Sequence, residues 1–258
     1  MFDLSHKNIL ITGALGTLGR AYIEAIVSCG GNVFALDLPS EHPFEAEKSV
    51  QYWQCDLSVE ADVRRVFSEL SGMVGSLDAI VSNAAITGEF MVKRGGNPFA
   101  KLSEYALEDW NSVLDVNLTA PFLLAKYGEA LLAAGSNPVF INVSSVYGFT
   151  SPDFSMYDDQ PFGSMMAYSA SKAGVHGITL WLSGYWKKLG VRVNTIVPGG
   201  VYNGHAQSFA SRYASKTIAG KMADPRDMVG PLIFLISDDS SYVRGQSLVV
   251  DGGLISSV

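Results

Sequence analysis

Short apolar runs alternate with longer segments of helical periodicity along the whole chain. A short apolar run between turn residues is typical of a buried strand, whereas apolar residues three and four positions apart indicate a helix. The apolar runs predict strands at residues 8–12, 32–36, 50–54, 78–82, 138–143, 191–197 and 247–250. The periodic segments predict helices at residues 17–29, 59–72, 104–134, 164–189, 206–220 and 225–236, the third broken near Asn117 to Pro121.

This alternation predicts an α/β fold, with one doubly wound parallel sheet of about seven strands and helices on both faces, as in a Rossmann domain. No linker, repeat or low-complexity stretch interrupts the 258 residues, so we expect a single domain over residues 1–258. Ligands in such folds bind at the carboxyl ends of the strands. Three segments there, 87–101, 150–163 and 199–222, are expected to serve as substrate loops.

Composition narrows the class of protein. The net charge is −7 and no basic cluster exceeds two residues, so nucleic acid is not an expected partner. No apolar run approaches the ~18 residues that a membrane span needs, and the N-terminus lacks a signal-peptide core. Cys29 and Cys55 lie too far apart for a metal knuckle, and the four histidines have no ligand spacing. We therefore expect a cytoplasmic protein with reduced thiols, no metal site and no membrane contact.

A glycine-rich turn follows the first predicted strand. Gly13, Gly16 and Gly19 occupy the segment between this strand and a predicted helix. Glycines allow a tight turn and the close approach of a pyrophosphate, and the helix N-terminus offers free N–H groups to an anion. The context of strand, turn and helix therefore predicts a dinucleotide site; the alternative is an ordinary βαβ turn.

Asp37 ends the second predicted strand, at the interval after the turn where an acidic residue binds the ribose hydroxyls of NAD. A 2′-phosphate would meet a negative charge there. We therefore expect NAD(H) to be preferred, with NADP(H) possible.

Tyr168 and Lys172 are four residues apart on a predicted helix, so their side chains share one face. A free tyrosine has a pKa of about 10, too high for easy proton exchange near pH 7. A neighbouring ammonium stabilises the phenolate and is expected to lower that pKa. The pair thus predicts an acid–base group that acts on a hydroxyl or carbonyl oxygen.

Together with further motifs, these features resemble the short-chain dehydrogenase/reductase superfamily almost from end to end. The further motifs are Asp56-Leu57, Ser82-Asn83-Ala84-Ala85, Asp115-Val116-Asn117-Leu118, Asn142-Val143-Ser144-Ser145, Pro198-Gly199 and Asp251-Gly252-Gly253. The resemblance implies a reversible hydride transfer between a carbinol carbon and nicotinamide. It implies the catalytic residues Asn117, Ser145, Tyr168 and Lys172, with Ser144 as the adjacent alternative to Ser145. The implied cofactor-binding residues are Gly13, Gly16, Thr17, Leu18, Gly19, Asp37, Asp56, Leu57, Asn83, Ala84, Ala85, Tyr168, Lys172, Pro198, Gly199 and Val201.

The chain departs from the family pattern in four places. The spacing of Gly13, Gly16 and Gly19 is more typical of the longer, extended branch of the superfamily. The interval between Ser145 and Tyr168 is unusually long, and residues 87–101 make a long loop. A threonine that family members often carry after Pro198-Gly199 is missing. Asn117 is expected to support a water molecule that relays protons past Lys172.

The sequence defines the reaction more closely than it defines the substrate. The long interval contains Asp153, Asp158 and Asp159, which are expected to face a polar, hydroxylated substrate, and Lys93, Arg94 and His205 are candidates at the same mouth. The segment resembles oxidoreductases of bacterial surface-sugar pathways, including legionaminic-type sugars. The alternatives are a 3-oxoacyl (acyl-carrier-protein) reductase and a catalytically silent, cofactor-binding regulator.

Small and apolar residues surround the helix of Tyr168 on more than one face, which predicts a homo-oligomer, most simply a tetramer or a dimer.

Overall fold

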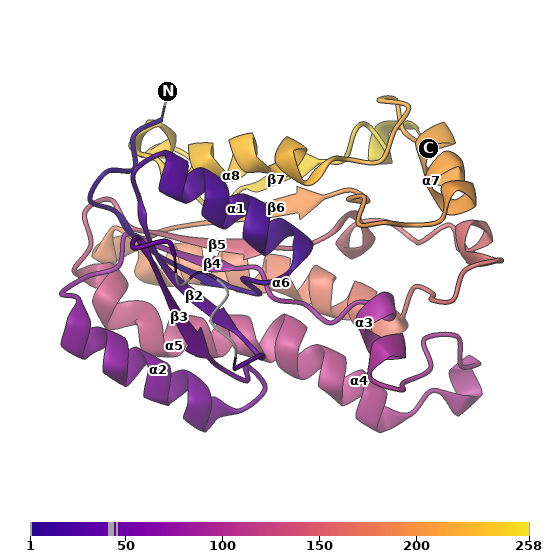
Figure 1. Ribbon diagram of the computed structural model, residues 1–258, viewed down its shortest axis with the longest axis horizontal. Coiled ribbons are helices and arrows are strands. Elements are labelled where there is room, and N and C mark those ends of the chain that lie inside the picture. The colour runs from indigo at the N-terminus through magenta and orange to yellow at the C-terminus, as the bar shows by residue number, and fades with distance from the viewer. Residues whose placement is uncertain (1, 41–43, 45, 258) are drawn as a thin grey trace.

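The computed structural model describes residues 2–40, 44 and 46–257 (Figure 1). Within them, seven parallel strands form one sheet in the order β3-β2-β1-β4-β5-β6-β7. The strands are β1 (Asn8–Thr12), β2 (Asn32–Asp37), β3 (Val50–Gln54), β4 (Ala79–Ser82), β5 (Val139–Val143), β6 (Arg192–Pro198) and β7 (Ser247–Val250). The order reverses between β1 and β4, which is where a doubly wound sheet opens a crevice for ligands. The predicted fold class is confirmed.

Helices cover both faces of this sheet because its strand residues are apolar on both sides. Ile9 and Ile11 pack with α1 (Thr17–Ser28) and α8 (Val229–Ile236). Leu10, between them, faces the opposite layer, which contains α2 (Glu60–Met73), α5 (Ala120–Ala133) and α6 (Met166–Tyr185). In Figure 1 the first pair of helices lies above the sheet, and α2 and α5 lie below it.

The predicted break in the helix of residues 104–134 is a π-helical turn. α4 (Leu107–Leu114) continues through the π turn at Asp115–Thr119 directly into α5. Pro121 lies in the first turn of α5, where its missing N–H is tolerated. A π turn inserts one extra residue and commonly marks a functional position. Here it turns Asn117 into the protein interior, with 1 % of its surface exposed.

The bounds of several other helices differ from those predicted, in segments where the sequence pattern was weak. Residues 87–101 were expected to be a loop but contain α3 (Gly88–Lys93), whose N-cap is Thr87. The helix expected over 206–220 is the shorter α7 (Gln207–Ser215). Single 3₁₀ turns form at Phe154–Tyr157, Trp186–Leu189 and Pro225–Met228.

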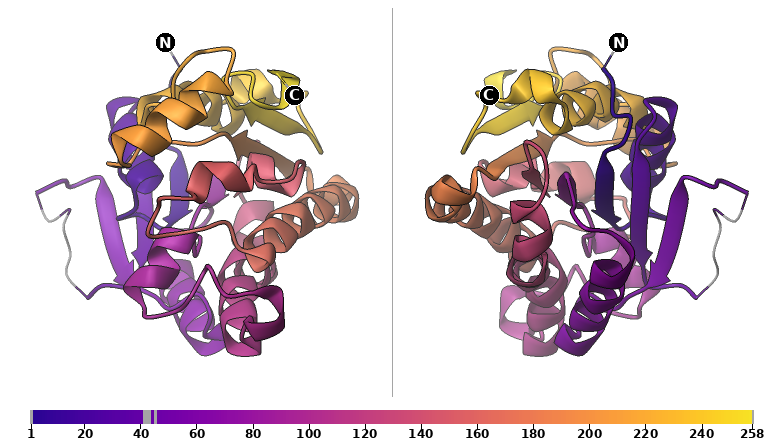
Figure 2. Two further views of the ribbon diagram at one scale, coloured as in Figure 1. Left: turned by 90° about the vertical axis from the view of Figure 1, so that its right-hand side faces the viewer. Right: turned by 90° about the vertical axis from the view of Figure 1, so that its left-hand side faces the viewer.

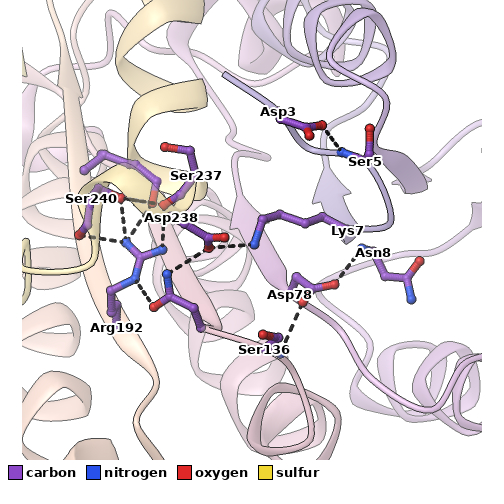
Figure 3. A network of polar contacts seen from close by, with 12 residues as sticks. Asp3, Ser5, Lys7, Asn8, Asp78, Ser136, Arg192, Ser237, Asp238 and Ser240 are labelled. Atoms are coloured by element: carbon purple, nitrogen blue, oxygen red, sulfur yellow. Dashed lines mark hydrogen bonds and ion pairs between the residues drawn. The ribbon is translucent and has the colours of Figure 1, made fainter. Parts of the chain in front are cut away.

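A partly buried polar network links the amino ends of the strands (Figure 3). The Arg192 guanidinium, fully buried, donates to the Leu235 carbonyl oxygen at 2.9 Å and to Ser240 Oγ at 2.8 Å, and so satisfies acceptors at the end of α8. Asp238 accepts from Lys7 Nζ at 2.8 Å, which joins the start of β1 to the same corner. These charged groups form bonds within the protein, whereas the carboxyl ends of the strands remain open for a ligand.

Candidate active site

A cavity of about 600 Å³ lies at the carboxyl ends of the strands. The left view of Figure 2 faces this end of the molecule, where α3, α7 and the segment of residues 150–163 surround it. All of the predicted catalytic and cofactor-binding residues line this cavity except Gly19 and Asn117. The structure thus brings the predicted cofactor and catalytic groups into one space.

The glycine turn between β1 and α1 requires the absence of side chains at two positions. Gly13 has a φ of +64°, and a Cβ there would lie 2.8 Å from the Cα of Ala84. A Cβ on Gly19 would overlap the carbonyl oxygen of Gly13. Gly19 therefore contributes indirectly, because it lets α1 pack closely against the turn.

The turn is held in place by bonds between the ends of β1 and β4. Thr12 Oγ1 accepts from the backbone N–H groups of Asn83 at 3.0 Å and Ala84 at 3.1 Å. Asn83 Nδ2 donates to the Thr12 carbonyl oxygen at 2.9 Å. α1 then begins at Thr17 with no acidic residue in its first turn and no side-chain cap on Gly16. Its first amides and its dipole therefore suit the pyrophosphate of a dinucleotide.

Asp37 ends β2, and its carboxylate is the group expected to bind the ribose next to the adenine. Its carboxylate accepts from the Leu15 N–H at 2.8 Å and from the Leu38 N–H at 2.7 Å while it lines the cavity. An ionised carboxylate has about four acceptor positions, so capacity remains for ribose hydroxyls. Asp56 and Leu57 follow β3, the strand beside β2, and also line the cavity. The residues present therefore fit a nicotinamide dinucleotide.

Ser145, Tyr168 and Lys172 form the predicted catalytic group. Ser145 and Tyr168 both line the cavity, and the Ser145 hydroxyl is close enough to the Tyr168 phenol to act on its pKa. Lys172 is 2 % exposed, and its Nζ donates to the Val143 carbonyl oxygen at 2.8 Å and lies 5.7 Å from the centre of the Tyr168 ring. The phenol and the hydroxyl thus meet at the cavity, with an ammonium buried beneath them.

The expected lowering of the Tyr168 pKa is not what the structure gives. Burial raises the pKa of Tyr168, the hydrogen bond from Ser145 opposes that rise, and the charge of Glu89 adds to it. Burial also lowers the pKa of Lys172, to about 8. Desolvation disfavours both the phenolate and the ammonium. It outweighs the attraction between Tyr168 and Lys172 that their spacing in the sequence suggested.

Asn117 and Ser144 support the site from behind. Asn117 Oδ1 accepts from the Ile86 N–H at 2.7 Å, and its Nδ2 donates to Ser171 Oγ at 3.2 Å, so it fixes the chain after β4 against α6. This geometry engages its amide within the protein rather than at the cavity surface. Ser144 Oγ donates to the Lys172 carbonyl oxygen at 2.8 Å and contacts His176 Nε2 at 3.0 Å. Of the two serines, Ser145 is therefore the one that acts on the pKa of Tyr168.

The acidic residues of the 150–163 segment were expected to face the substrate, and the structure contradicts this. Asp153 pairs with Lys216 Nζ at 3.1 Å, and Asp159 pairs with Arg212. None of Asp153, Asp158 and Asp159 lines the main cavity. The two ion pairs attach the segment to α7 and its C-terminal end, while Tyr157 and Phe162 face the cavity instead.

The sequence did not single out the residues that form the other wall of the cavity. Glu89 lines it from α3 and binds His205, and Phe209 and Tyr213 line it from α7. The hydroxyls of Tyr147 and Tyr157 are 2.8 Å apart. Tyr147 lies two residues after Ser145, and Tyr157 lies in the segment expected to contact the substrate, so these two residues carried a local signal in the sequence.

Comparison with known proteins gives the family. The family model described as Enoyl-(Acyl carrier protein) reductase matches residues 13–255. The chain is 31% identical to 2,5-dichloro-2,5-cyclohexadiene-1,4-diol dehydrogenase of Sphingobium indicum, over 98% of each chain. A crystal structure of a short-chain dehydrogenase from Leptospira borgpetersenii with bound NAD+ has a TM-score of 0.87 and 30% identity, over 98% of this chain and 94% of that one. A gluconate 5-dehydrogenase from Burkholderia cenocepacia, in complex with NADP and tartrate, has a TM-score of 0.86 and 26% identity, over 100% and 98%.

The fold and the site together define a nicotinamide-dependent dehydrogenase. The chain belongs to the short-chain dehydrogenase/reductase superfamily. The prediction of an enzyme class that acts on alcohol and carbonyl groups is confirmed.

Within residues 2–40, 44 and 46–257, no helix is long and apolar enough to cross a membrane. No group of three or more His, Cys, Asp or Glu side chains is arranged there to hold a metal ion. His42, one of the four histidines considered above, lies outside the described residues.

Proposed function

We propose that the protein is an NAD(H)-dependent oxidoreductase that interconverts a secondary alcohol and a ketone on a polar small molecule, with a sugar or sugar derivative as the favoured class. The observation that carries this proposal is that Ser145 and Tyr168 lie together on the cavity, with the buried ammonium of Lys172 5.7 Å from the centre of the Tyr168 ring. The pair presents a proton-transfer group and a second hydroxyl to one substrate oxygen.

The nicotinamide ring supplies the hydride chemistry when the cofactor is bound, and the protein supplies binding and proton management. Tyr168 gives its phenolic proton to the oxygen of a ketone, or takes one from an alcohol. Ser145 hydrogen-bonds the same oxygen as negative charge develops there. Lys172 places a positive charge behind the phenol, and Asn117 holds the wall on which α6 rests.

The character of the cavity supports a hydroxylated substrate. Aromatic rings and phenolic hydroxyls form one wall, through Tyr147, Tyr157 and Phe162, and a carboxylate forms another, through Glu89. Aromatic faces suit the C–H faces of a ring, and carboxylates accept bonds from hydroxyls. The relatives named above are a diol dehydrogenase and a gluconate dehydrogenase, which agrees with this class.

The function is tested by turnover of a substrate panel. Purified protein is mixed with NAD+ and polyols, sugars and simple alcohols, or with NADH and the corresponding ketones, and the nicotinamide absorbance is followed. We expect turnover of at least one hydroxylated substrate. Tight NADH binding without turnover of any member would favour the silent regulator. Turnover confined to a 3-oxoacyl thioester, included in the panel, would favour the reductase of acyl-carrier-protein substrates.

Asp37 is expected to set the cofactor preference. A 2′-phosphate beside its carboxylate adds like-charge repulsion, so NADH should bind at least about tenfold more tightly than NADPH, which corresponds to about 1.4 kcal/mol. Asp37→Ala removes the charge and should narrow this ratio, because it weakens the binding of NADH and removes the repulsion of the NADPH 2′-phosphate. Titration of both cofactors at one fixed salt concentration measures the ratio. Tighter binding of NADPH by the unmodified protein would refute the preference.

The outer surface of α6 supports a homo-oligomer, as either a tetramer or a dimer. Leu180, Trp181 and Tyr185 are each at least 60% exposed, and Trp181 stacks on Tyr185 with the ring centres 4.7 Å apart. An apolar helix face of this kind commonly marks a protein interface. We expect light scattering to give a multiple of 27.7 kDa at micromolar concentration. Trp181→Glu should shift the species toward the monomer, whereas a monomeric unmodified protein would contradict the proposal.

A further inference from the structure

Glu89 joins two segments that face each other across the mouth of the cavity. It lies on α3, after β4, and its partners lie in the loop after β6. Its Oε1 is 3.0 Å from His205 Nε2, and its Oε2 accepts from Asn203 Nδ2 at 2.8 Å. All three side chains line the cavity. The carboxylate is therefore fixed in position by two donors that come from a distant part of the chain.

The Glu89 carboxylate can accept more hydrogen bonds than these two. Each oxygen has a second acceptor position, and the Glu89 side chain is 28% exposed beside the cavity. Burial raises the pKa of Glu89, but the hydrogen bonds from His205 and Asn203 and the charges of His205 and Lys93 outweigh it, so the pKa lies below its ordinary value. Glu89 thus presents an ionised acceptor to whatever enters this space.

A hydroxyl without a partner lies on the segment that touches the start of α3. Ser164 lines the same cavity, and among the described residues its buried Oγ has no hydrogen-bond partner. A Cβ on Gly88 would overlap the carbonyl oxygen of Gly163, so the two backbones touch directly. Glu89 and Ser164 are the next residues on either side of this contact. A buried polar group without a partner is uncommon in folded proteins, and a ligand group is one explanation.

We propose that Glu89 and Ser164 together bind a second hydroxyl group of the substrate. That hydroxyl donates to the Glu89 carboxylate and accepts from Ser164 Oγ, while the first hydroxyl is the one that meets Tyr168. The pair then selects diols and hydroxyketones over isolated alcohols, and it disfavours a carboxylate at the same place. The inference rests on the proposed function, because it identifies the second group that the same site binds.

The test compares a diol with a matched alcohol that lacks the second hydroxyl. The kcat/KM values for cyclohexane-1,2-diol and cyclohexanol, with NAD+, are measured for the unmodified protein and for Glu89→Gln. A hydrogen bond to a charged group contributes about 1.5–3 kcal/mol, so the variant should lose about 10–100-fold on the diol. The value for cyclohexanol should change by less than about threefold. Ser164→Ala should reproduce the selective loss at roughly 3–10-fold, as for a neutral hydrogen bond.

Two controls separate recognition from structural damage. Glu104→Gln changes an exposed carboxylate that does not line the cavity, and it should alter neither substrate. NADH affinity should be equal in all variants. Equal losses on the diol and on cyclohexanol would show that Glu89 only fastens the two segments, and unchanged values on both would show no role; either result overturns the inference.

The outcome also distinguishes this inference from the proposed function. If the unmodified protein turns over cyclohexanol as efficiently as the diol, the function stands and the second-hydroxyl site fails. If neither alcohol is turned over, calorimetry with the diol and the NADH complex decides. Weaker diol binding by Glu89→Gln than by Glu104→Gln then supports the site, and equal binding overturns it.

Discussion

Tyr168→Phe is expected to reduce kcat by about 10²–10⁴-fold, the usual contribution of a general acid–base group, with little change in NADH affinity. The substitution removes one oxygen atom and leaves the ring in place. We expect the phenol to exchange the proton with the substrate, and the neighbouring Ser145 cannot take over because a serine hydroxyl is far too weak an acid. Single-turnover rates and a NADH titration measure the two quantities separately.

The matched control for this prediction is Tyr185→Phe. Tyr185 ends the same helix, α6, but is 60% exposed and does not line the cavity. Loss of the Tyr185 hydroxyl should leave kcat unchanged. A Tyr168→Phe enzyme that kept most of its kcat on a slow substrate would show that Tyr168 is a structural residue.

Gly13→Ala is expected to weaken NADH binding by about 10–10³-fold. A non-glycine residue in the left-handed region costs about 1–2 kcal/mol, and forcing a methyl group into a filled space costs about 1–3 kcal/mol. The new Cβ would meet the backbone of Ala84 at 2.8 Å, and a backbone atom cannot rotate away. Part of this free energy appears as lost stability and part as a displaced turn, so both the NADH dissociation constant and the free energy of unfolding should be measured.

Gly72→Ala provides the contrast. Gly72 lies within α2, its φ is not positive, and a Cβ there would meet no heavy atom within 4 Å. Alanine is the better helix former by about 1 kcal/mol, so this variant should be slightly stabilised with unchanged NADH affinity. If Gly13→Ala behaved like Gly72→Ala, the close approach of the turn to Ala84 would not matter for the cofactor.

The cofactor half of the site was predictable because its signals are local. The glycine turn, Asp37 and the Tyr168–Lys172 spacing are each contained within one element and its neighbouring turn. Their positions follow from the rule that ligands meet parallel strands at their carboxyl ends. The structure accordingly places these residues on one cavity.

The substrate half depends on contacts between distant segments, which the sequence pattern does not encode. Glu89 meets Asn203 and His205 only because α3 and the loop after β6 face each other. Asp153 and Asp159 appeared to be free acceptors, yet cations near the end of α7 pair with them. The raised pKa of Tyr168 likewise reflects burial, a property of the assembled fold.

The most direct test of the central claim, hydride transfer at this site, is deuterium transfer from NADH labelled at C4 of the nicotinamide. The unmodified protein is incubated with a hydroxyketone substrate from the panel and each of the two C4 epimers of labelled NADH, and the product is examined by NMR. We expect one epimer to deliver deuterium to the carbinol carbon, and Tyr168→Phe to slow this transfer by about 10²–10⁴-fold although it binds NADH. Ketone reduction without deuterium from either epimer would contradict the claim.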